Sequence, residues 1–254
     1  MRRASALACF GVVSVCLALS NASEIPAPFD SVTSGTSTIL QTTVELIQDG
    51  SFELGSPNPY WVASDPWLIA SSGWCSPRTG SWFGHLGAGE GWVEQTVMIP
   101  PTGPVTLVFF MADVFNDVEA LDPGLRTPPA DTLTVYVDST PLESIPWYLS
   151  GYQYYALDLS GFADGGAHTL RFWFNALVDH AFCLDDVSVT APAIPLAERD
   201  ALLALYSSAG GPGWADSSGW LGPRGSECGW FGITCTAGGT RVQKVELPSN
   251  SLAG

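Results

Sequence analysis

The sequence predicts a mainly β protein, an antiparallel β-sandwich followed by a small α/β unit. Three observations lead to this fold class. The 254 residues include 27 glycines and 19 prolines, an excess that favours a turn-rich β protein over a helical bundle. Residues 44–191 contain short runs of alternating apolar and polar side chains separated by turn residues. A single convincing helical segment follows, at 196–208.

The strands are predicted from alternation with a period of two residues. The clearest runs are 131–138 and 168–174, in which one face is apolar: Leu133, Val135 and Val137 in the first, and Leu170, Phe172 and Phe174 in the second. Further strands are expected at 92–99, 105–111, 154–159 and 182–190. Tryptophans inside strand-like runs are expected to pack in the core: Trp82, Trp92 and Trp173.

The texture changes after Thr190, where residues 191–195 form a proline-marked linker. The helix predicted at 196–208 has acidic residues in its first turns and ends before a Gly-Gly-Pro sequence. Its apolar face is expected to contain Leu196, Leu203 and either Leu205 or Tyr206. We therefore divide the mature chain into a Ser/Thr/Pro-rich leader at 23–43, the sandwich at 44–191 and a second domain at 192–254.

The first 22 residues have the features of a secretory signal peptide. Arg2 and Arg3 precede an uncharged apolar run, and a small-x-small site predicts cleavage after Ala22. A membrane anchor is the alternative, but the run is shorter than the roughly 20 residues of a membrane span. Val15 precedes Cys16, where a lipoprotein signal needs a small residue. The sequence thus predicts a secreted protein, extracellular or at the cell surface.

The charge balance excludes one class of partner. Nine basic against 25 acidic residues give a formal charge of −16, which repels phosphate backbones and anionic lipid surfaces. We expect no nucleic-acid binding, and no stretch after the signal peptide could span a membrane.

The mature chain keeps four cysteines, an even number that predicts disulfides in an oxidising compartment. Cys228 and Cys235 are seven residues apart and suggest a local loop closure, which leaves Cys75 to pair with Cys183. Zinc binding is the competing interpretation, but no Cys-x-x-Cys sequence is present.

The second domain contains a set of characteristic segments: Asp200–Tyr206, Gly210–Trp214, Ser218–Trp220, Cys228–Cys235 and Arg241-Val242. With these segments it resembles the N-terminal cap of extracellular leucine-rich-repeat proteins. Residues 242–254 fit one repeat, with Asn250 in the ladder position. Because one repeat cannot bury its own apolar face, we expect the N-terminal piece of a longer array; the alternative is a degenerate cap packed on the sandwich. The resemblance implies a protein partner bound through the repeats.

The framework of the predicted sandwich contains these segments: Gln48–Glu53, Pro77–Phe83, Glu94–Val97, Asp131–Asp138, Leu157–Ser160, His168–Phe172 and Leu184–Val187. With them the sandwich resembles the galactose-binding-like jelly roll, the fold of many bacterial carbohydrate-binding modules. The sequence departs from the family at Asp49-Gly50, where such modules usually have Asn-Gly. The resemblance implies a glycan or polysaccharide ligand.

The same resemblance implies a structural calcium ion (Ca²⁺), with Glu53, Asp185 and Asp186 in the positions of its ligands. Carboxylates from distant segments suit the six to eight oxygen ligands that calcium prefers. Adjacent strand residues point to opposite faces, so only one of the two aspartates can serve an inward ion, and alternation favours Asp185. Solvated turn carboxylates are the alternative.

Sugar binding requires exposed aromatic rings with polar groups nearby. The candidates are Trp67, Trp74, Trp147 and Tyr148, with Tyr60, Trp61 and Tyr152 in the same two loop regions and Asp65 and Gln153 beside them. Core packing is the alternative for each.

No catalytic pattern accompanies these candidates. The sequence contains no Gly-x-Ser-x-Gly elbow, zinc-protease motif or phosphate-binding loop, and we expect structural roles for His85, His168 and His180. The sequence therefore predicts a non-catalytic binding protein, in which the jelly roll binds carbohydrate and the repeat region binds protein. The alternatives are a calcium-stiffened adhesion spacer without a sugar pocket, or accessory modules of a longer hydrolase.

Overall fold

A computed structural model describes residues 43–101, 103–115, 131–146 and 151–253. All of the described residues belong to one compact unit. The predicted signal peptide and all of the leader before Thr43 lie outside the described residues, as do Trp147 and Tyr148. Within the described ranges, no helix has the length and apolarity needed to cross a membrane.

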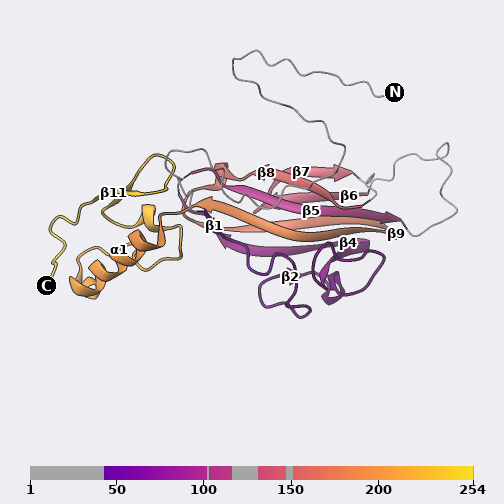
Figure 1. Cartoon of the computed structure of the whole chain (residues 1–254). Coiled ribbons are helices and arrows are strands. Elements are labelled where there is room, and N and C mark those ends of the chain that lie inside the picture. The colour runs from indigo at the N-terminus through magenta and orange to yellow at the C-terminus, as the bar shows by residue number, and fades with distance from the viewer. Residues whose placement is uncertain (1–42, 102, 116–130, 147–150, 254) are drawn as a thin grey trace, which may run out of the picture. The chain divides into compact units, whose positions relative to one another are not determined.

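Nine antiparallel strands are hydrogen-bonded to one another in the described part of the chain (Figure 1). They are β1 (Thr43–Glu45), β2 (Val62–Ala63), β3 (Ile69–Ala70), β4 (Phe83–Met98), β5 (Thr106–Phe115), β6 (Thr132–Val137), β7 (Thr140–Pro146), β8 (Gln153–Asp158) and β9 (Ala167–Pro192). Short 3₁₀ turns, η1 (Pro66–Leu68) and η3 (Ser160–Phe162), interrupt them. The mainly β, antiparallel fold class is confirmed.

The long strands β4 and β9 connect the two layers of the sandwich. The C-terminal half of β4 pairs with residues 167–176 of β9, which also pair with β6, and β7 continues this layer beyond β6. The N-terminal end of β4 pairs with residues 181–184 of β9, whose C-terminal half pairs with β5, and β8 lies beyond β5. A register shift between Gly87 and Gly89 separates the two halves of β4.

Two of the predicted strands, at 168–174 and 182–190, are parts of the single strand β9. The strand β7 was not predicted, because its sequence contains Pro141 and Pro146 and few apolar residues. Proline cannot donate a ladder hydrogen bond and is therefore confined to sheet edges and strand ends. β7 pairs with β6 alone, and this edge position is compatible with both prolines.

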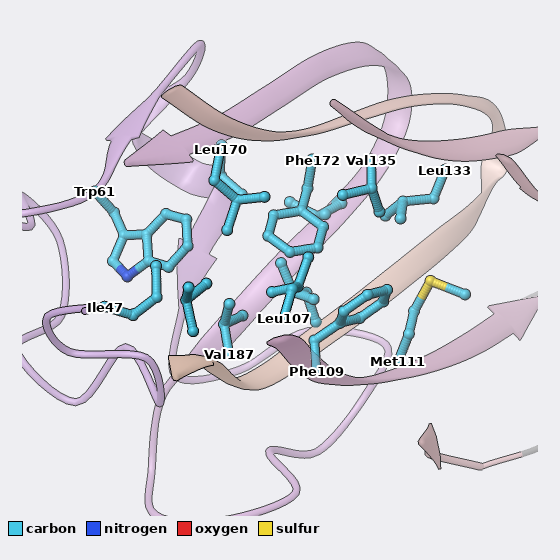
Figure 2. Close-up of a cluster of buried hydrophobic side chains, with 14 of the residues drawn as sticks. Ile47, Trp61, Leu107, Phe109, Met111, Leu133, Val135, Leu170, Phe172 and Val187 are labelled. Carbon is cyan, nitrogen blue, oxygen red and sulfur yellow. The ribbon is translucent and has the colours of Figure 1, made fainter. Parts of the chain in front are cut away.

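The core lies between the two layers (Figure 2). Side chains of β5, β6 and β9 point toward one another there: Leu107, Phe109, Met111, Leu133, Val135, Leu170 and Phe172. The rings of Phe109 and Phe172 meet edge to face with centroids 5.1 Å apart. The predicted apolar faces of residues 131–138 and 168–174 are thus confirmed, because all six side chains are at most 1% exposed.

Residues from Ile194 onward form a second, smaller core. Its helix α1 (Leu196–Ser208) has the predicted bounds, and three tryptophans, Trp214, Trp220 and Trp230, are buried with it. The apolar face differs from the prediction: Leu196 is 55% exposed, whereas Leu202 is buried. The helix begins at Leu196, so this residue has no preceding turn to pack against. The remaining elements are η4 (Gly211–Gly213), η5 (Glu227–Gly229) and the hairpin of β10 (Ile233–Cys235) with β11 (Val242–Val245).

A buried ion pair joins α1 to the loop after Trp220. Arg199 contacts the carboxylate of Glu227, whose side chain is fully buried, and also donates to the carbonyl oxygen of Gly222 at 2.7 Å. The Arg199 guanidinium lies 5.3 Å from the ring centroid of Trp230. Removal of either charge would leave the other buried without its partner.

Candidate functional site

Two tryptophans and a tyrosine lie on the outward side of β4, β9 and β6. Trp92 is directly opposite Trp173 on β9, and Arg171 is directly opposite Tyr136 on β6. All four side chains are half-buried. We call this surface the tryptophan face and define it by the outward residues of the three strands: Glu90, Trp92, Glu94 and Thr96; Thr169, Arg171, Trp173 and Asn175; Thr132, Thr134 and Tyr136.

Alternation along each strand creates this surface. Val93 and Phe172 point into the core and are fully buried, so Trp92 and Trp173, one position away along their strands, point outward. Neighbouring strands lie about 4.8 Å apart and rise about 3.4 Å per residue. The seven residues from Glu90 to Thr96 are separated by six steps and therefore span about 20 Å, enough for several consecutive sugar rings.

Polar contacts fix the rings of the tryptophan face. The Arg171 Nε atom donates to Glu94 Oε2 at 2.6 Å, and the guanidinium carbon is 4.9 Å from the ring centroid of Trp92. The indole nitrogen of Trp173 donates to Glu90 Oε1 at 3.2 Å. Held rings lose little side-chain freedom when a ligand binds, which favours affinity.

This surface corrects the expectation that Trp92 and Trp173 pack in the core. Trp82, the third tryptophan of that prediction, does pack against the core. The signal that could have found the surface was present in the sequence: once Phe172 and Phe174 are assigned to the buried face, Arg171 and Trp173 must point outward.

The predicted loop aromatics are in three different situations. Trp67, on η1, is 82% exposed, and its backbone N–H donates to Asp65 Oδ1 at 2.9 Å. Tyr60 is 46% exposed. Trp61 is buried, with its indole nitrogen donating to the carbonyl oxygen of Asp49 at 2.9 Å. Trp61 is therefore a core residue, whereas Trp67 is accessible to a ligand.

Trp74 and Tyr152 are involved in packing a loop on the sheet. Trp74 is half-buried and meets the His85 ring edge to face, with centroids 5.8 Å apart. The Tyr152 hydroxyl donates to the carbonyl oxygen of Ser76 at 3.0 Å. Burial and the nearby carboxylate of Asp185 raise the pKa of Tyr152, so its hydroxyl stays protonated. Burial also favours the uncharged form of His85, whose pKa is lowered.

The three carboxylates predicted to bind calcium hold the loop at 78–82. Glu53 Oε1 accepts from the backbone N–H groups of Ser81 and Trp82, at 2.8 and 2.9 Å. Gly80 makes this approach possible, because a Cβ atom there would be 2.2 Å from the same oxygen. Asp185 Oδ2 accepts from the N–H groups of Arg78 and Thr79, at 2.7 and 3.1 Å. Asp186 accepts from the Arg78 guanidinium and from the Thr79 hydroxyl.

Carboxylate oxygens that face N–H donors do not suit a shared cation. Among the described residues, no three His, Cys, Asp or Glu side chains are grouped as metal ligands. As arranged, Glu53, Asp185 and Asp186 therefore do not fit the implied calcium, which stays a prediction. Asp185 is fully buried, as alternation predicts. Burial raises its pKa to about 6; the negative charge of Asp186 also raises the pKa, whereas the backbone hydrogen bonds lower it.

Both predicted disulfides are present, Cys75 with Cys183 and Cys228 with Cys235. The first links the loop before β4 to β9 across 108 residues. The second closes the seven-residue loop between η5 and β10. Such bridges stabilise mainly by restricting the unfolded chain.

His168 lies between two carboxylates at one end of the sandwich. Its Nδ1 atom is 2.9 Å from Asp138 Oδ2, and its Nε2 atom is 3.0 Å from Asp164 Oδ1. Burial is the largest single influence and opposes the charged ring, but the two hydrogen bonds and charges together raise the pKa of His168. His180, in turn, contacts the buried carboxylate of Asp131.

Comparisons with known proteins add a structural likeness. No family model matches the chain, and no curated protein matches it. Solved structures with a similar fold include TmCBM61 in complex with β-1,4-galactotriose, at 12% identity over 57% of this chain and 97% of that chain, with a TM-score of 0.42. A family 35 carbohydrate binding module from Clostridium thermocellum is 14% identical over 60% and 99% of the two chains, with a TM-score of 0.32.

Another similar structure is the K3 adhesin domain of Lys-gingipain from Porphyromonas gingivalis, at 14% identity over 58% of this chain and all of that chain, with a TM-score of 0.39. Each of these matches leaves about two fifths of the present chain uncovered.

Proposed function

We propose that the sandwich is a non-catalytic carbohydrate-binding domain and that the tryptophan face binds the glycan. The observation that carries this proposal is the placement of Trp92, Trp173 and Tyr136 on adjacent strands, with polar side chains between them. Aromatic faces stack on the C–H surfaces of sugar rings, and Glu, Arg, Asn and Thr side chains supply hydrogen bonds to hydroxyl groups. Core packing alone would not require aromatic rings and hydrogen-bonding side chains together on the outward side of the sheet.

Affinity gel electrophoresis tests the proposal, with β-1,4-galactan, xylan, glucomannan and β-1,3-glucan as the polymers in the gel. We expect retardation of the wild-type protein by at least one polymer, and up to about tenfold weaker binding for Trp92→Ala, since one aromatic contact contributes about 0.5–1.5 kcal/mol. Absence of retardation in all four gels, or an undiminished retardation of Trp92→Ala, would contradict the proposal.

The variants Trp67→Ala and Trp74→Ala are matched controls in the same gels. Among the predicted aromatic residues that the structure describes, Trp67 is the most exposed, and it lies outside the tryptophan face as defined. If Trp67→Ala abolished binding while Trp92→Ala retained it, the glycan site would lie on the loop that contains η1. The non-catalytic part of the proposal is checked by incubation of each bound polymer with the protein, in which we expect no new reducing ends.

We also propose that residues 192–254 are the N-terminal cap and first repeat of a leucine-rich-repeat domain that binds a protein partner. The buried amide of Asn250 supports this proposal, because it accepts from the N–H and donates to the carbonyl oxygen of Asp216, at 2.7 and 2.8 Å. Glu198 on α1 similarly accepts from the N–H of Val242 at the start of β11.

The exposed apolar residues Val245 and Leu252 allow a test of the partner proposal. An array of extracellular proteins is probed with the chain and with the variant Val245→Glu/Leu252→Glu. Binding that the variant loses would support the proposal; no binding, or binding that the variant retains, would contradict it.

We further propose that the protein is secreted. The two disulfides support an oxidising compartment. Mass spectrometry of the protein from its natural source is expected to find Ser23 as the first residue, and a retained N-terminal segment would contradict cleavage after Ala22.

A further inference from the structure

The tryptophan face has a charge pattern that bears on the class of glycan it can accept. Its charged members are Glu90, Glu94 and Arg171, so the formal charge of the face is −1. The single cation is already paired, because Arg171 Nε donates to Glu94 Oε2 at 2.6 Å and the guanidinium lies close to the Trp92 ring. Arg171 is thus committed to two neighbours within the face.

The residues that define the tryptophan face include no second cation to balance the negative charge of Glu90. Its side chain is exposed, and its Oε1 atom accepts from the indole N–H of Trp173, a neutral donor. Asn175, directly opposite Glu90, is also neutral. Carboxylates accept hydrogen bonds from sugar hydroxyls, but they repel carboxylate or sulfate groups on a ligand.

The repulsion acts at short range and is therefore retained in salt. The indole nitrogen of Trp173 is 3.2 Å from Glu90 Oε1, so a ligand stacked on this ring lies closer to that carboxylate than the screening length of about 8 Å at physiological ionic strength. The chain as a whole, with a formal charge of −16, adds repulsion in the same direction at lower salt.

We infer that the tryptophan face selects uncharged, hydroxyl-rich polysaccharides, and that Glu90 and Glu94 are the residues that reject uronate-containing and sulfated polymers. This inference rests on the proposed function of the same face. Glu94 has a double role, because it contributes negative charge and also removes Arg171 from reach of an anionic sugar.

The experiment compares polymers that differ in charge along the same backbone. The pairs are β-1,4-galactan, glucomannan and β-1,3-glucan, each with its own C6-oxidised uronate form, and arabinoxylan with glucuronoxylan. Binding is measured in about 0.15 M salt, and the readout is the ratio of the affinities for the neutral and the anionic member of a pair. We expect a ratio of at least about ten for every pair whose neutral member is bound.

The variants Glu94→Gln and Glu90→Gln/Glu94→Gln are expected to lower that ratio at least threefold, the double variant more than the single. Glu246→Gln is the matched control, since it removes one exposed carboxylate from the C-terminal domain, outside the tryptophan face. We expect it to leave the ratio unchanged.

The outcomes separate the two proposals. If no neutral or anionic polymer is bound, the proposed glycan-binding function fails. If a neutral polymer is bound and its anionic partner binds equally well or better, the function stands and the charge selection is overturned. An equal change of the ratio in Glu246→Gln and Glu94→Gln would also overturn it, because the effect would then come from net charge.

Discussion

Replacement by alanine at two consecutive residues of β9 should affect different properties: Phe172→Ala should mainly lower stability, and Trp173→Ala should mainly weaken glycan binding. Phe172 is fully buried and contacts the rings of Trp61 and Phe109. Loss of a buried phenylalanine costs about 3–5 kcal/mol, because transfer and cavity terms add. At about 2–4 °C per kcal/mol for a protein of this size, the Phe172→Ala variant should melt about 6–20 °C lower.

The Trp173→Ala variant removes a half-buried ring from the outer side and one hydrogen bond to Glu90. A net hydrogen bond contributes about 0.5–1.5 kcal/mol and a cross-strand pair about 0.2–1 kcal/mol, so the loss of stability should be about 1–2 kcal/mol. This variant should bind glycan up to about tenfold more weakly, however, whereas Phe172→Ala should keep the wild-type affinity at temperatures where it is folded.

Urea unfolding and affinity electrophoresis of the same two preparations provide the measurement. The assigned register requires the two phenotypes to separate, since a slip of one residue would exchange the faces of both side chains. If Trp173→Ala were as destabilised as Phe172→Ala and bound glycan normally, the tryptophan face would be a packing surface and the proposed function would be refuted.

Three further predictions concern charged groups. Because the pKa of His168 is raised, its contribution to stability is complete below its unfolded value of 6.5 and declines as the pH rises through the raised value; urea unfolding from about pH 5.5 to 8.5 should show the decline, and His168→Gln should flatten it. Arg199→Met should lower the free energy of unfolding by about 3–5 kcal/mol, because Glu227 stays buried without its partner, and adding Glu227→Gln should restore part of this loss. If Glu53 and Asp185 hold a calcium ion, the melting temperature of the protein should rise when calcium is added and fall in EDTA; equal melting temperatures in calcium and in EDTA would contradict the calcium prediction.

Local patterns predicted a large part of the fold. The bounds of α1, the apolar faces of β6 and β9 and the two disulfide pairs were all predictable, because each depends on residues close in sequence or on a small number of possible pairings. The edge strand β7 is not predicted, because Pro141 and Pro146 are typical of loops. A strand can accommodate these prolines only where one of its sides has no neighbouring strand, as is the case for β7. That condition is a property of the sheet and not of the segment.

The candidate site was only half predictable. The sequence predicts exposed aromatic residues in loops, and Trp67 is indeed exposed, but it also predicts strand tryptophans in the core because tryptophans are mostly buried in proteins. For Trp92 and Trp173 the frequency of burial was a weaker guide than the phase of the alternation, since Phe172 and Val93 already occupy the inward positions.

Even the correct phase could not have identified the surface as a site. Taken alone, Trp92 is an outward tryptophan on one strand, and Trp173 is another that lies 81 positions further along the chain. They become a pair because β4 and β9 align in the register that places Trp92 opposite Trp173 and Glu94 opposite Arg171. That register is set by the many core contacts along both strands, which local patterns do not contain. The proposed glycan site therefore arises at the level of strand pairing, and we expect the paired charge of Arg171 and the unbalanced charge of Glu90 to determine which sugars it accepts.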